Sequence, residues 1–168
     1  LRALARLSIQ DLKKFKGIGE AKAISIIAAM ELGRRRKDSK PVAKPRITCS
    51  QDIYDLMRPE LLDAHVEYFY LILLNRSNQV MKKHLVSQGG TAGTVVDPKV
   101  VFKVALEYLA QSVILVHNHP SGNISPSEQD KRLTQRLVHI GRELDFTVLD
   151  HVIFTDSGYF SFADDGSL

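Results

Sequence analysis

Hydrophobic and polar positions follow a helical period over the first 33 residues of the chain. Apolar side chains recur at intervals of three and four in residues 8–15 and again in residues 20–33, which is the spacing of one helix face. Ser8 precedes the first segment as an N-cap, and Gly33 closes the second. This pattern predicts a small α-helical hairpin.

The turn between these helices reads KGIGEAK, residues 16–22. Gly17 and Gly19 allow positive φ angles and a close approach of backbone amides to a ligand, and Glu20 opens a helix whose N-terminus favours an anion. The segment resembles the helix-hairpin-helix module, in which a Gly-Ile-Gly hairpin contacts a DNA phosphate without reading sequence. A hairpin used only for packing is the alternative. Because such modules usually work in pairs, residues 1–33 are expected to form a partial one.

Charge is distributed unevenly along the chain. Residues 34–46, RRRKDSKPVAKPR, hold seven basic residues and two prolines without apolar periodicity, which predicts a basic linker. Residues 1–46 carry a net charge of +9, whereas residues 47–168 carry −5. This asymmetry indicates that the basic N-terminal arm contacts a polyanion and that the acidic remainder of the chain has a different function. We therefore expect non-specific DNA contact through residues 13–46, with a solvated tether as the alternative.

From residue 47 onward, helical and strand periods alternate. Strands are expected at residues 66–75, 79–88, 113–119, 146–155 and 159–163, and helices at residues 50–57, 58–65, 97–112 and 126–144. The first two strands would pair across the turn at residues 75–78, and Asp97 with Pro98 would begin the third helix. The stretch at residues 87–97 is either a peptide-binding edge or a connection. Strands separated by helices predict a three-layer α/β domain over residues 47–168.

Composition narrows the class of protein. The chain is 44% hydrophobic without an apolar run near 18 residues, so no membrane span is expected. Its one cysteine, Cys49, rules out an internal disulfide framework and a cysteine-built metal site, and suits a reducing cytoplasm. A reactive nucleophile is the sharper interpretation of Cys49, but its place at the entry of a helix or strand favours a structural one.

The stretch ILVHNHPSGNISPSEQD, residues 114–130, carries the candidate chemistry. Residues i and i+2 of a strand point to the same face, so His117 and His119 present both imidazoles together while Asn118 points away. Asp130 follows in the first turns of the next helix. Two imidazoles and one carboxylate form a three-ligand set that leaves a fourth tetrahedral position for water, as in catalytic zinc sites.

The helix that carries this aspartate is expected to begin shortly before it. Ser125 is the predicted N-cap, with Pro126 at the first helical position and Glu128 completing a capping box. Ser127 and Asp130, three residues apart, would then share one face of the helix.

Simpler interpretations exist for each residue alone. Histidines at a strand end can be turn residues, and Asp130 can be an acid favoured near a helix N-terminus by the macrodipole. The joint pattern of His-x-His-Pro with Ser and Asp at fixed offsets favours a metal site. An HNH nuclease is disfavoured, because its residues are spread over a hairpin and a helix. The other candidate histidines, His65, His84 and His139, are expected to be surface or packing residues.

The motif His117-x-His119-Pro, Ser127 and Asp130 resembles the JAMM (MPN+) zinc metalloprotease motif, whose members include isopeptidases that remove ubiquitin-like modifiers. The strings AHVEYFYLILLN, VILVHNHPSGNISPSEQD and VLDHVIF are similar to bacterial RadC proteins, and the resemblance covers essentially the whole chain. It implies a JAMM/MPN, cytidine-deaminase-like fold with a mixed sheet. It also implies one zinc per chain, bound by the two histidines and Asp130, and an oxyanion stabilised by Ser127.

Glu67 matches the glutamate that this family uses at the start of its first core strand. The residues support the same choice, because an activated water needs a base to take its proton and an acid to return it. Glu67 borders a long apolar strand, whereas Glu60, Glu107 and Glu128 are expected in helices or in capping. A solvated glutamate at a strand edge is the alternative. For Asp150-His151, which resembles a RadC feature, a hydrogen bond to a ligand is the one role considered.

These expectations describe a zinc-dependent hydrolase of the RadC/JAMM type. The zinc would lower the pKa of its water and polarise the scissile carbonyl, Glu67 would shuttle the proton, and Ser127 would donate to the oxyanion. A peptide or protein substrate, cleaved by a metallopeptidase or isopeptidase, is the first hypothesis. A metal-dependent nuclease served by the basic arm is the second. A DNA-associated repair or recombination accessory protein is the third.

Overall fold

The computed structural model describes residues 3–39, 43–89 and 96–168, which form two compact units, Leu1–Ala43 and Lys44–Leu168. No helix in these ranges is long and apolar enough to cross a bilayer. Most of the stretch at residues 87–97, considered above as a peptide-binding edge, lies outside the described residues.

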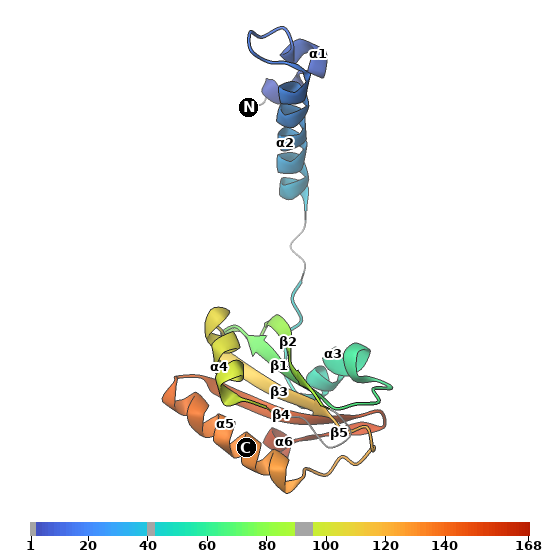
Figure 1. The fold of residues 1–168 in the computed structure, drawn as a ribbon, viewed down its shortest axis with the longest axis vertical. Helices are drawn as coiled ribbons and strands as arrows, with labels where there is room; N and C mark the ends of the chain where they lie inside the picture. The colour runs from blue at the N-terminus through green and yellow to red at the C-terminus, as the bar shows by residue number, and fades with distance from the viewer. Residues whose placement is uncertain (1–2, 40–42, 90–95) are drawn as a thin grey trace. The chain divides into compact units, whose positions relative to one another are not determined.

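The N-terminal unit contains η1 (Leu4–Arg6), α1 (Ile9–Leu12) and α2 (Glu20–Asp38) (Figure 1). Ser8 is the N-cap of α1, as expected: its hydroxyl accepts a hydrogen bond from the Asp11 amide, and the Asp11 carboxylate accepts from the Ser8 amide. The helix is shorter than the predicted segment at residues 8–15. Gly17 has a φ of 86°, and Gly19 is the N-cap of α2.

The predicted end of α2 at Gly33 is wrong, because the helix continues to Asp38 and includes the start of the predicted linker. Glu31 accounts for the extension. Its carboxylate accepts hydrogen bonds of 2.8 Å from both Arg34 and Arg35, and such pairs one turn apart stabilise a helix. Basic residues in the last turn also complement the helix dipole. Together these effects offset the cost of an interior glycine, about 1 kcal/mol.

The C-terminal unit is built on a five-stranded mixed sheet in the order β2-β1-β3-β4-β5 (Figure 1). The strands are β1 (Tyr68–Leu74), β2 (Val80–Gln88), β3 (Ser112–Asn118), β4 (Thr147–Thr155) and β5 (Gly158–Ser161). β1 is antiparallel to both β2 and β3, β4 is parallel to β3, and β5 is antiparallel to β4. The predicted pairing of the first two strands is confirmed; in their turn, the Asn75 side chain accepts from the amides of Ser77 and Gln79.

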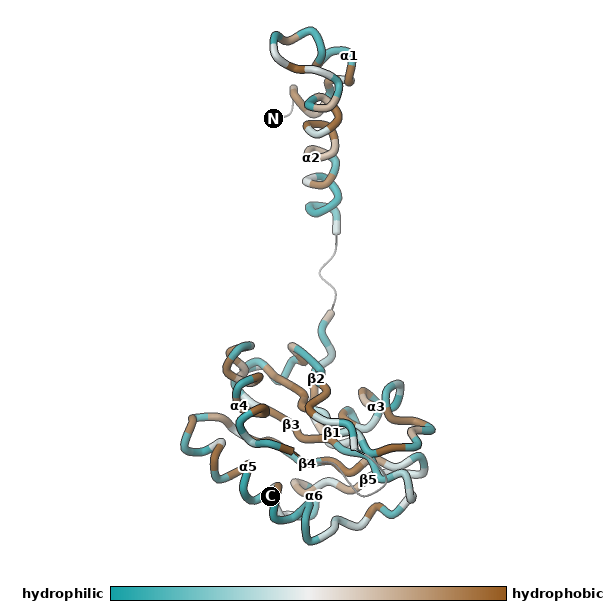
Figure 2. The backbone as a smooth tube through the Cα atoms, viewed as in Figure 1, coloured by the Kyte–Doolittle hydropathy of each residue, from teal (hydrophilic) through white to brown (hydrophobic). Residues whose placement is uncertain are grey.

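Helices cover both faces of this sheet, which confirms the predicted three-layer α/β arrangement. α4 (Pro98–Glu107) and α5 (Glu128–Glu143) lie on one face, α3 (Ser50–Leu61) lies on the other, and α6 (Phe162–Asp165) follows β5. Hydrophobic residues follow the central strands (Figure 2). Because successive side chains of a strand alternate, Leu73 and Leu115 of β1 and β3 pack with α4 and α5, whereas Ile72 and Ile114 pack with α3.

A single helix, α3, replaces the two short helices expected at residues 50–57 and 58–65. Pro59 lies inside its last turn, where the missing amide removes only one intrahelical hydrogen bond. Met57 and Leu61, on either side of the proline, are fully buried against the sheet. This packing keeps the chain helical through Pro59. Cys49 is the exposed N-cap of the helix.

Candidate metal centre

The end of β3 and the start of α5 bring the three predicted ligands together. His117 is on β3, His119 follows that strand directly, and Asp130 is in the first turn of α5. One ligand atom from each residue lies within 4.8 Å of the others. Among the described residues this is the only such group of His, Cys, Asp and Glu side chains. His65, His84 and His139 do not belong to it.

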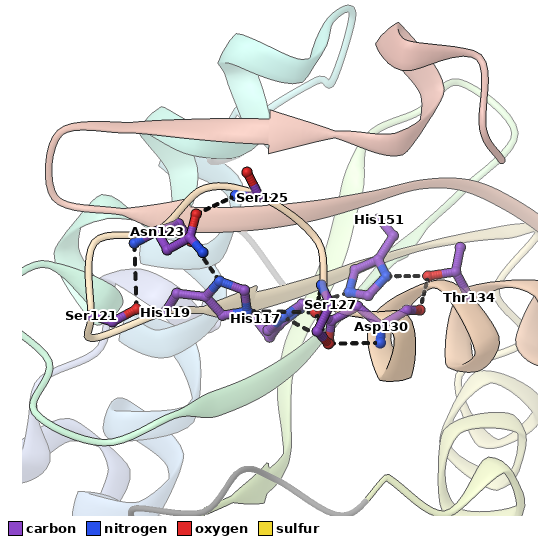
Figure 3. A network of polar contacts seen from close by, with 9 residues as sticks. All are labelled: His117, His119, Ser121, Asn123, Ser125, Ser127, Asp130, Thr134 and His151. Carbon is purple, nitrogen blue, oxygen red and sulfur yellow. Dashed lines mark hydrogen bonds and ion pairs between the residues drawn. The ribbon is translucent and has the colours of Figure 1, made fainter.

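The spacing of the ligand atoms suits one small metal ion (Figure 3). His117 Nε2 lies 3.0 Å from His119 Nε2 and 3.2 Å from Asp130 Oδ1. His119 Nε2 lies 3.6 Å from Asp130 Oδ2. A tetrahedral zinc with bonds of about 2.0–2.1 Å holds its ligands about 3.3–3.4 Å apart. The observed distances are therefore close to those of ligands that share one small metal ion.

A backbone carbonyl orients the ring of His119. The Nδ1 atom of His119 lies 2.6 Å from the carbonyl oxygen of Asn123, and because a carbonyl only accepts, Nδ1 must carry the hydrogen. In the neutral ring the lone pair is then on Nε2, the atom that faces Asp130. Asn123 is itself fixed, since its side-chain oxygen accepts from the amide of Ser125 at 3.0 Å.

Asp130 is held by the residue that caps its helix. Asp130 Oδ2 accepts from the amide and the hydroxyl of Ser127, at 2.7 and 2.6 Å, and the hydroxyl oxygen accepts from the Asp130 amide at 3.1 Å. This is a capping box, with Ser127 as the N-cap. Its reciprocal hydrogen bonds fix the orientation of the ligand carboxylate.

The predicted start of α5 was therefore wrong by two residues. Ser125 and Ser127 each have an acidic residue three positions on, so both fit the spacing of a capping box. The hydrogen bond from the Ser125 amide to Asn123 holds Ser125 in a turn. The helix begins at Glu128, which does not take part in capping and pairs instead with Lys131 at 2.8 Å.

The charges of the site support one another. Partial burial raises the pKa of Asp130, but the neighbouring imidazoles of His117 and His119 and the hydrogen bonds from Ser127 outweigh burial and hold that pKa well below its usual range. The neighbouring carboxylate of Asp130 in turn raises the pKa of His119, although burial lowers it. The site therefore attracts a cation, and at low pH that cation is a proton on His119.

Glu67 precedes β1 directly and is partly buried. The side chain of Asn118 fixes the residues on both sides of Glu67. Its Nδ2 donates to the Val66 carbonyl at 3.0 Å, and its Oδ1 accepts from the Tyr68 amide at 2.7 Å. The negative charge of Glu67 also contributes to the raised pKa of His119. The backbone around Glu67 is thus anchored to the end of the strand that carries His117, and the role of Glu67 as a base stays a prediction.

The sequence predicted that Asn118 points away from the ligands, but it did not predict the hydrogen bonds of this side chain to the start of β1. Asn118 is buried, with 2% of its surface exposed, and it joins the start of β1 to the end of β3. The available signal in the sequence was an asparagine between two histidines, because its side chain offers a hydrogen-bond donor and an acceptor at the end of a strand. Its hydrogen-bond partners could be named only once β1 was known to lie beside β3.

Asp150 and His151 have separate tasks. Asp150 accepts from the Ser161 hydroxyl at 2.7 Å and from the Ala163 amide at 3.0 Å, so it anchors the start of α6. Burial raises its pKa. His151 is fully buried, and its Nε2 lies 2.8 Å from His117 Nδ1, so the hydrogen bond considered from the sequence is present. Burial, and next the charge of His117, lower the pKa of His151 well below its usual value.

Comparison with known proteins places this geometry in a family. The sequence profile of the RadC-like JAB domain matches residues 47–167. A "UPF0758 protein" of Flavobacterium johnsoniae is 46% identical over 166 residues, covering 99% of this chain and 72% of that protein. One of Porphyromonas gingivalis is 42% identical over 170 residues, covering 100% and 75%. One of Desulforamulus reducens is 41% identical over 166 residues, covering 99% and 73%.

These matches confirm the resemblance to RadC proteins and the JAMM/MPN type of the fold, which the five-stranded mixed sheet also displays. The profile match covers β3, the loop that follows it and α5, and so includes all three candidate ligands. Relatives above 40% identity extend the similarity to nearly the whole chain. The chain belongs to the family of proteins with a RadC-like JAB domain.

Proposed function

We propose that this chain is a metal-dependent hydrolase that binds one zinc ion and cleaves a peptide or isopeptide bond. The observation that carries the proposal is the convergence of His117 Nε2 with His119 Nε2 at 3.0 Å and with Asp130 Oδ1 at 3.2 Å. Two nitrogens and one carboxylate oxygen are a donor set of catalytic zinc sites that keep one position open. Membership of the JAB domain family supports a metal-dependent hydrolase.

A zinc ion bound there supplies Lewis acidity, which lowers the pKa of a water ligand and polarises a carbonyl group. The residues of the chain supply the remaining chemistry. Glu67 takes the proton from the attacking water and returns it to the leaving amine. The two hydrogen bonds of the Asn118 side chain to the backbone on either side of Glu67 support this role, because they fix the backbone position from which the Glu67 side chain extends.

Ser127 would contribute in two ways. Its hydroxyl donates to Asp130 at 2.6 Å, which orients a ligand. To donate to the tetrahedral oxyanion as well, the hydroxyl must exchange that partner during the reaction. We therefore assign Ser127 first to ligand orientation and second to oxyanion stabilisation.

Elemental analysis tests the metal proposal directly. We expect about one zinc per chain in the wild-type protein and loss of that zinc in His119→Ala and Asp130→Ala. Cleavage of peptide and isopeptide-linked substrates, lost in Glu67→Gln while zinc is retained, would support the reaction. Failure of the wild-type protein to take up zinc would contradict the proposal. Cleavage of DNA alone would favour the nuclease alternative.

A second candidate function is non-specific DNA contact by residues 13–46, as expected for an accessory protein in repair or recombination. The net charge of +9 over residues 1–46 favours it. Gly17 takes a positive φ, and the N-cap Gly19 has no side chain, which leaves the first amides of α2 open to a phosphate. This contact would be independent of the hydrolytic site.

A further inference from the structure

Two buried residues outside the ligand set, Thr134 and His151, form a hydrogen-bonded chain that ends on a ligand. Thr134 Oγ1 lies 2.7 Å from the backbone carbonyl of Asp130 and 2.6 Å from His151 Nδ1. His151 Nε2 lies 2.8 Å from His117 Nδ1. Figure 3 shows Thr134 and His151 beside the ligands. The chain thus starts at the backbone of one ligand and ends at the ring of another.

The direction of every hydrogen bond in this chain is determined by its first member. A carbonyl oxygen only accepts, so the single hydroxyl hydrogen of Thr134 is donated to Asp130. The hydroxyl must then accept at its contact with His151, which puts a hydrogen on His151 Nδ1. A neutral imidazole carries one hydrogen, so His151 Nε2 accepts, and His117 Nδ1 must be the donor.

The hydrogen-bonded chain ends at the His117 ring, whose Nε2 atom is the candidate metal ligand. With the hydrogen on Nδ1, the lone pair of His117 is on Nε2, the atom that lies 3.0 Å from His119 Nε2 and 3.2 Å from Asp130 Oδ1. The opposite tautomer would aim a hydrogen at the other ligands and would leave two facing lone pairs between His117 and His151. Only the Nδ1–H tautomer of His117 donates to His151 and at the same time presents a lone pair to a metal ion between the ligands.

We propose that Thr134, acting through His151, fixes the tautomer of His117 so that Nε2 is held ready for the metal. Thr134 and His151 are positioning residues, because neither contacts the reacting atoms. The inference rests on the metal-binding site of the proposed function, and it explains why His117 presents its Nε2 lone pair to that site. Partners of this kind typically alter metal affinity by about 10–100-fold.

Burial shields the hydrogen bonds between Thr134, His151 and His117 from water. Thr134, His151 and His117 have exposed fractions of 1%, 0% and 3%, so water does not readily replace a missing partner. His151 also stacks on Phe162 with ring centroids 5.0 Å apart, so packing alone is the competing explanation for its presence. A test must therefore remove the hydrogen bond and keep the shape.

Thr134→Val removes the hydroxyl and preserves the branched shape, whereas Thr134→Ser keeps the hydroxyl and serves as the matched control. Zinc affinity is measured by competition with a chromophoric chelator. The ring tautomers are read from long-range ¹H–¹⁵N spectra of the metal-free full-length protein, and thermal unfolding verifies that each variant is folded.

We expect His117 of the wild type and of Thr134→Ser to carry its hydrogen on Nδ1. In Thr134→Val, part of the population should shift to Nε2–H, with zinc affinity about 10–100-fold weaker. An Nε2–H tautomer of His117 in the folded wild type would overturn the inference, as would a folded Thr134→Val with unchanged tautomer and affinity. The two proposals fail in different measurements. If the wild type binds no zinc, the proposed function fails, whereas the tautomer of His117 in the metal-free protein tests the inference by itself.

Discussion

The hydroxyl of Ser127 donates to the carboxylate of Asp130 across 2.6 Å, and the Asp130 amide donates back to that hydroxyl across 3.1 Å. The first turn of α5 and the ligand carboxylate are therefore held by the same pair of residues. A substitution at Ser127 should change the free energy of unfolding and the metal affinity together.

Ser127→Ala should lower the free energy of unfolding by about 1 kcal/mol, because loss of an N-cap usually costs that much. It should also weaken zinc binding by about 10-fold, because the ligand carboxylate loses an orienting partner. Urea unfolding and chelator competition measure the two effects. Ser8→Ala is the matched control, since Ser8 forms the same capping box with Asp11 in the other compact unit. Equal zinc affinities of Ser127→Ala and Ser8→Ala would contradict the orienting role.

Zinc affinity should depend on pH through His119. The neighbouring carboxylate of Asp130 raises the pKa of His119 above the ordinary value of 6.5, so below the raised pKa the metal must displace a proton. The apparent affinity should rise about tenfold per pH unit in that range and level off above it. Calorimetry in buffers of different ionisation enthalpy would count the released proton. An affinity that stays flat from pH 5.5 to 8, about the range in which histidine titrates, would exclude this competition.

Asn118→Ala should separate stability from metal binding. It leaves the Val66 carbonyl and the Tyr68 amide without their partners, and each buried unpaired group costs about 1–3 kcal/mol. We expect a loss of about 2 kcal/mol in urea unfolding, a zinc affinity close to wild type, and hydrolysis reduced at least tenfold.

Glu67→Gln is the matched control for Asn118→Ala, since it should abolish hydrolysis at nearly unchanged stability. Full hydrolytic activity in a folded Asn118→Ala would show that the anchoring of Glu67 is not required.

DNA contact should depend on the charges of the N-terminal unit. Lys16→Glu and Lys22→Glu should each weaken binding of duplex DNA and reduce the slope of log affinity against log salt by roughly 0.9 per lost phosphate contact. Fluorescence anisotropy at several salt concentrations measures both quantities. Lys99→Glu, the same charge change at an exposed position of α4, should leave the salt slope unchanged. The same slope in all three variants would argue against a contact through residues 13–46.

The sequence was sufficient for features that depend on local periodicity. The apolar run at residues 66–75, the strand pattern at residues 79–88 and the turn between them predicted the first hairpin, because such signals are local. The grouping of His117, His119 and Asp130 was also predictable, since a strand end and the following helix start are close in space. The resemblance to RadC proteins extended this to the fold type, which the family profile confirms.

Other features depend on partners far along the chain. α3 continues through Pro59 because Met57 and Leu61 are buried on the sheet, and no local signal reports that burial. The choice of Ser127 over Ser125 as the N-cap depends on the loop conformation around Asn123. Thr134 was not predicted at all. Its partner His151 is on a different element, and strand pairing had to be known before the two could be connected.

The parallel pairing of β3 with β4 places all three ligands and both positioning residues within one β-α-β crossover, β3 to α5 to β4, together with its connecting loops. The candidate metal centre is therefore local in the chain. Glu67 comes from outside this crossover, at the start of the separate β1–β2 hairpin. The three ligands and the proposed base thus come from separate segments of the chain, so Glu67 can be substituted without changing the segment that holds the ligands.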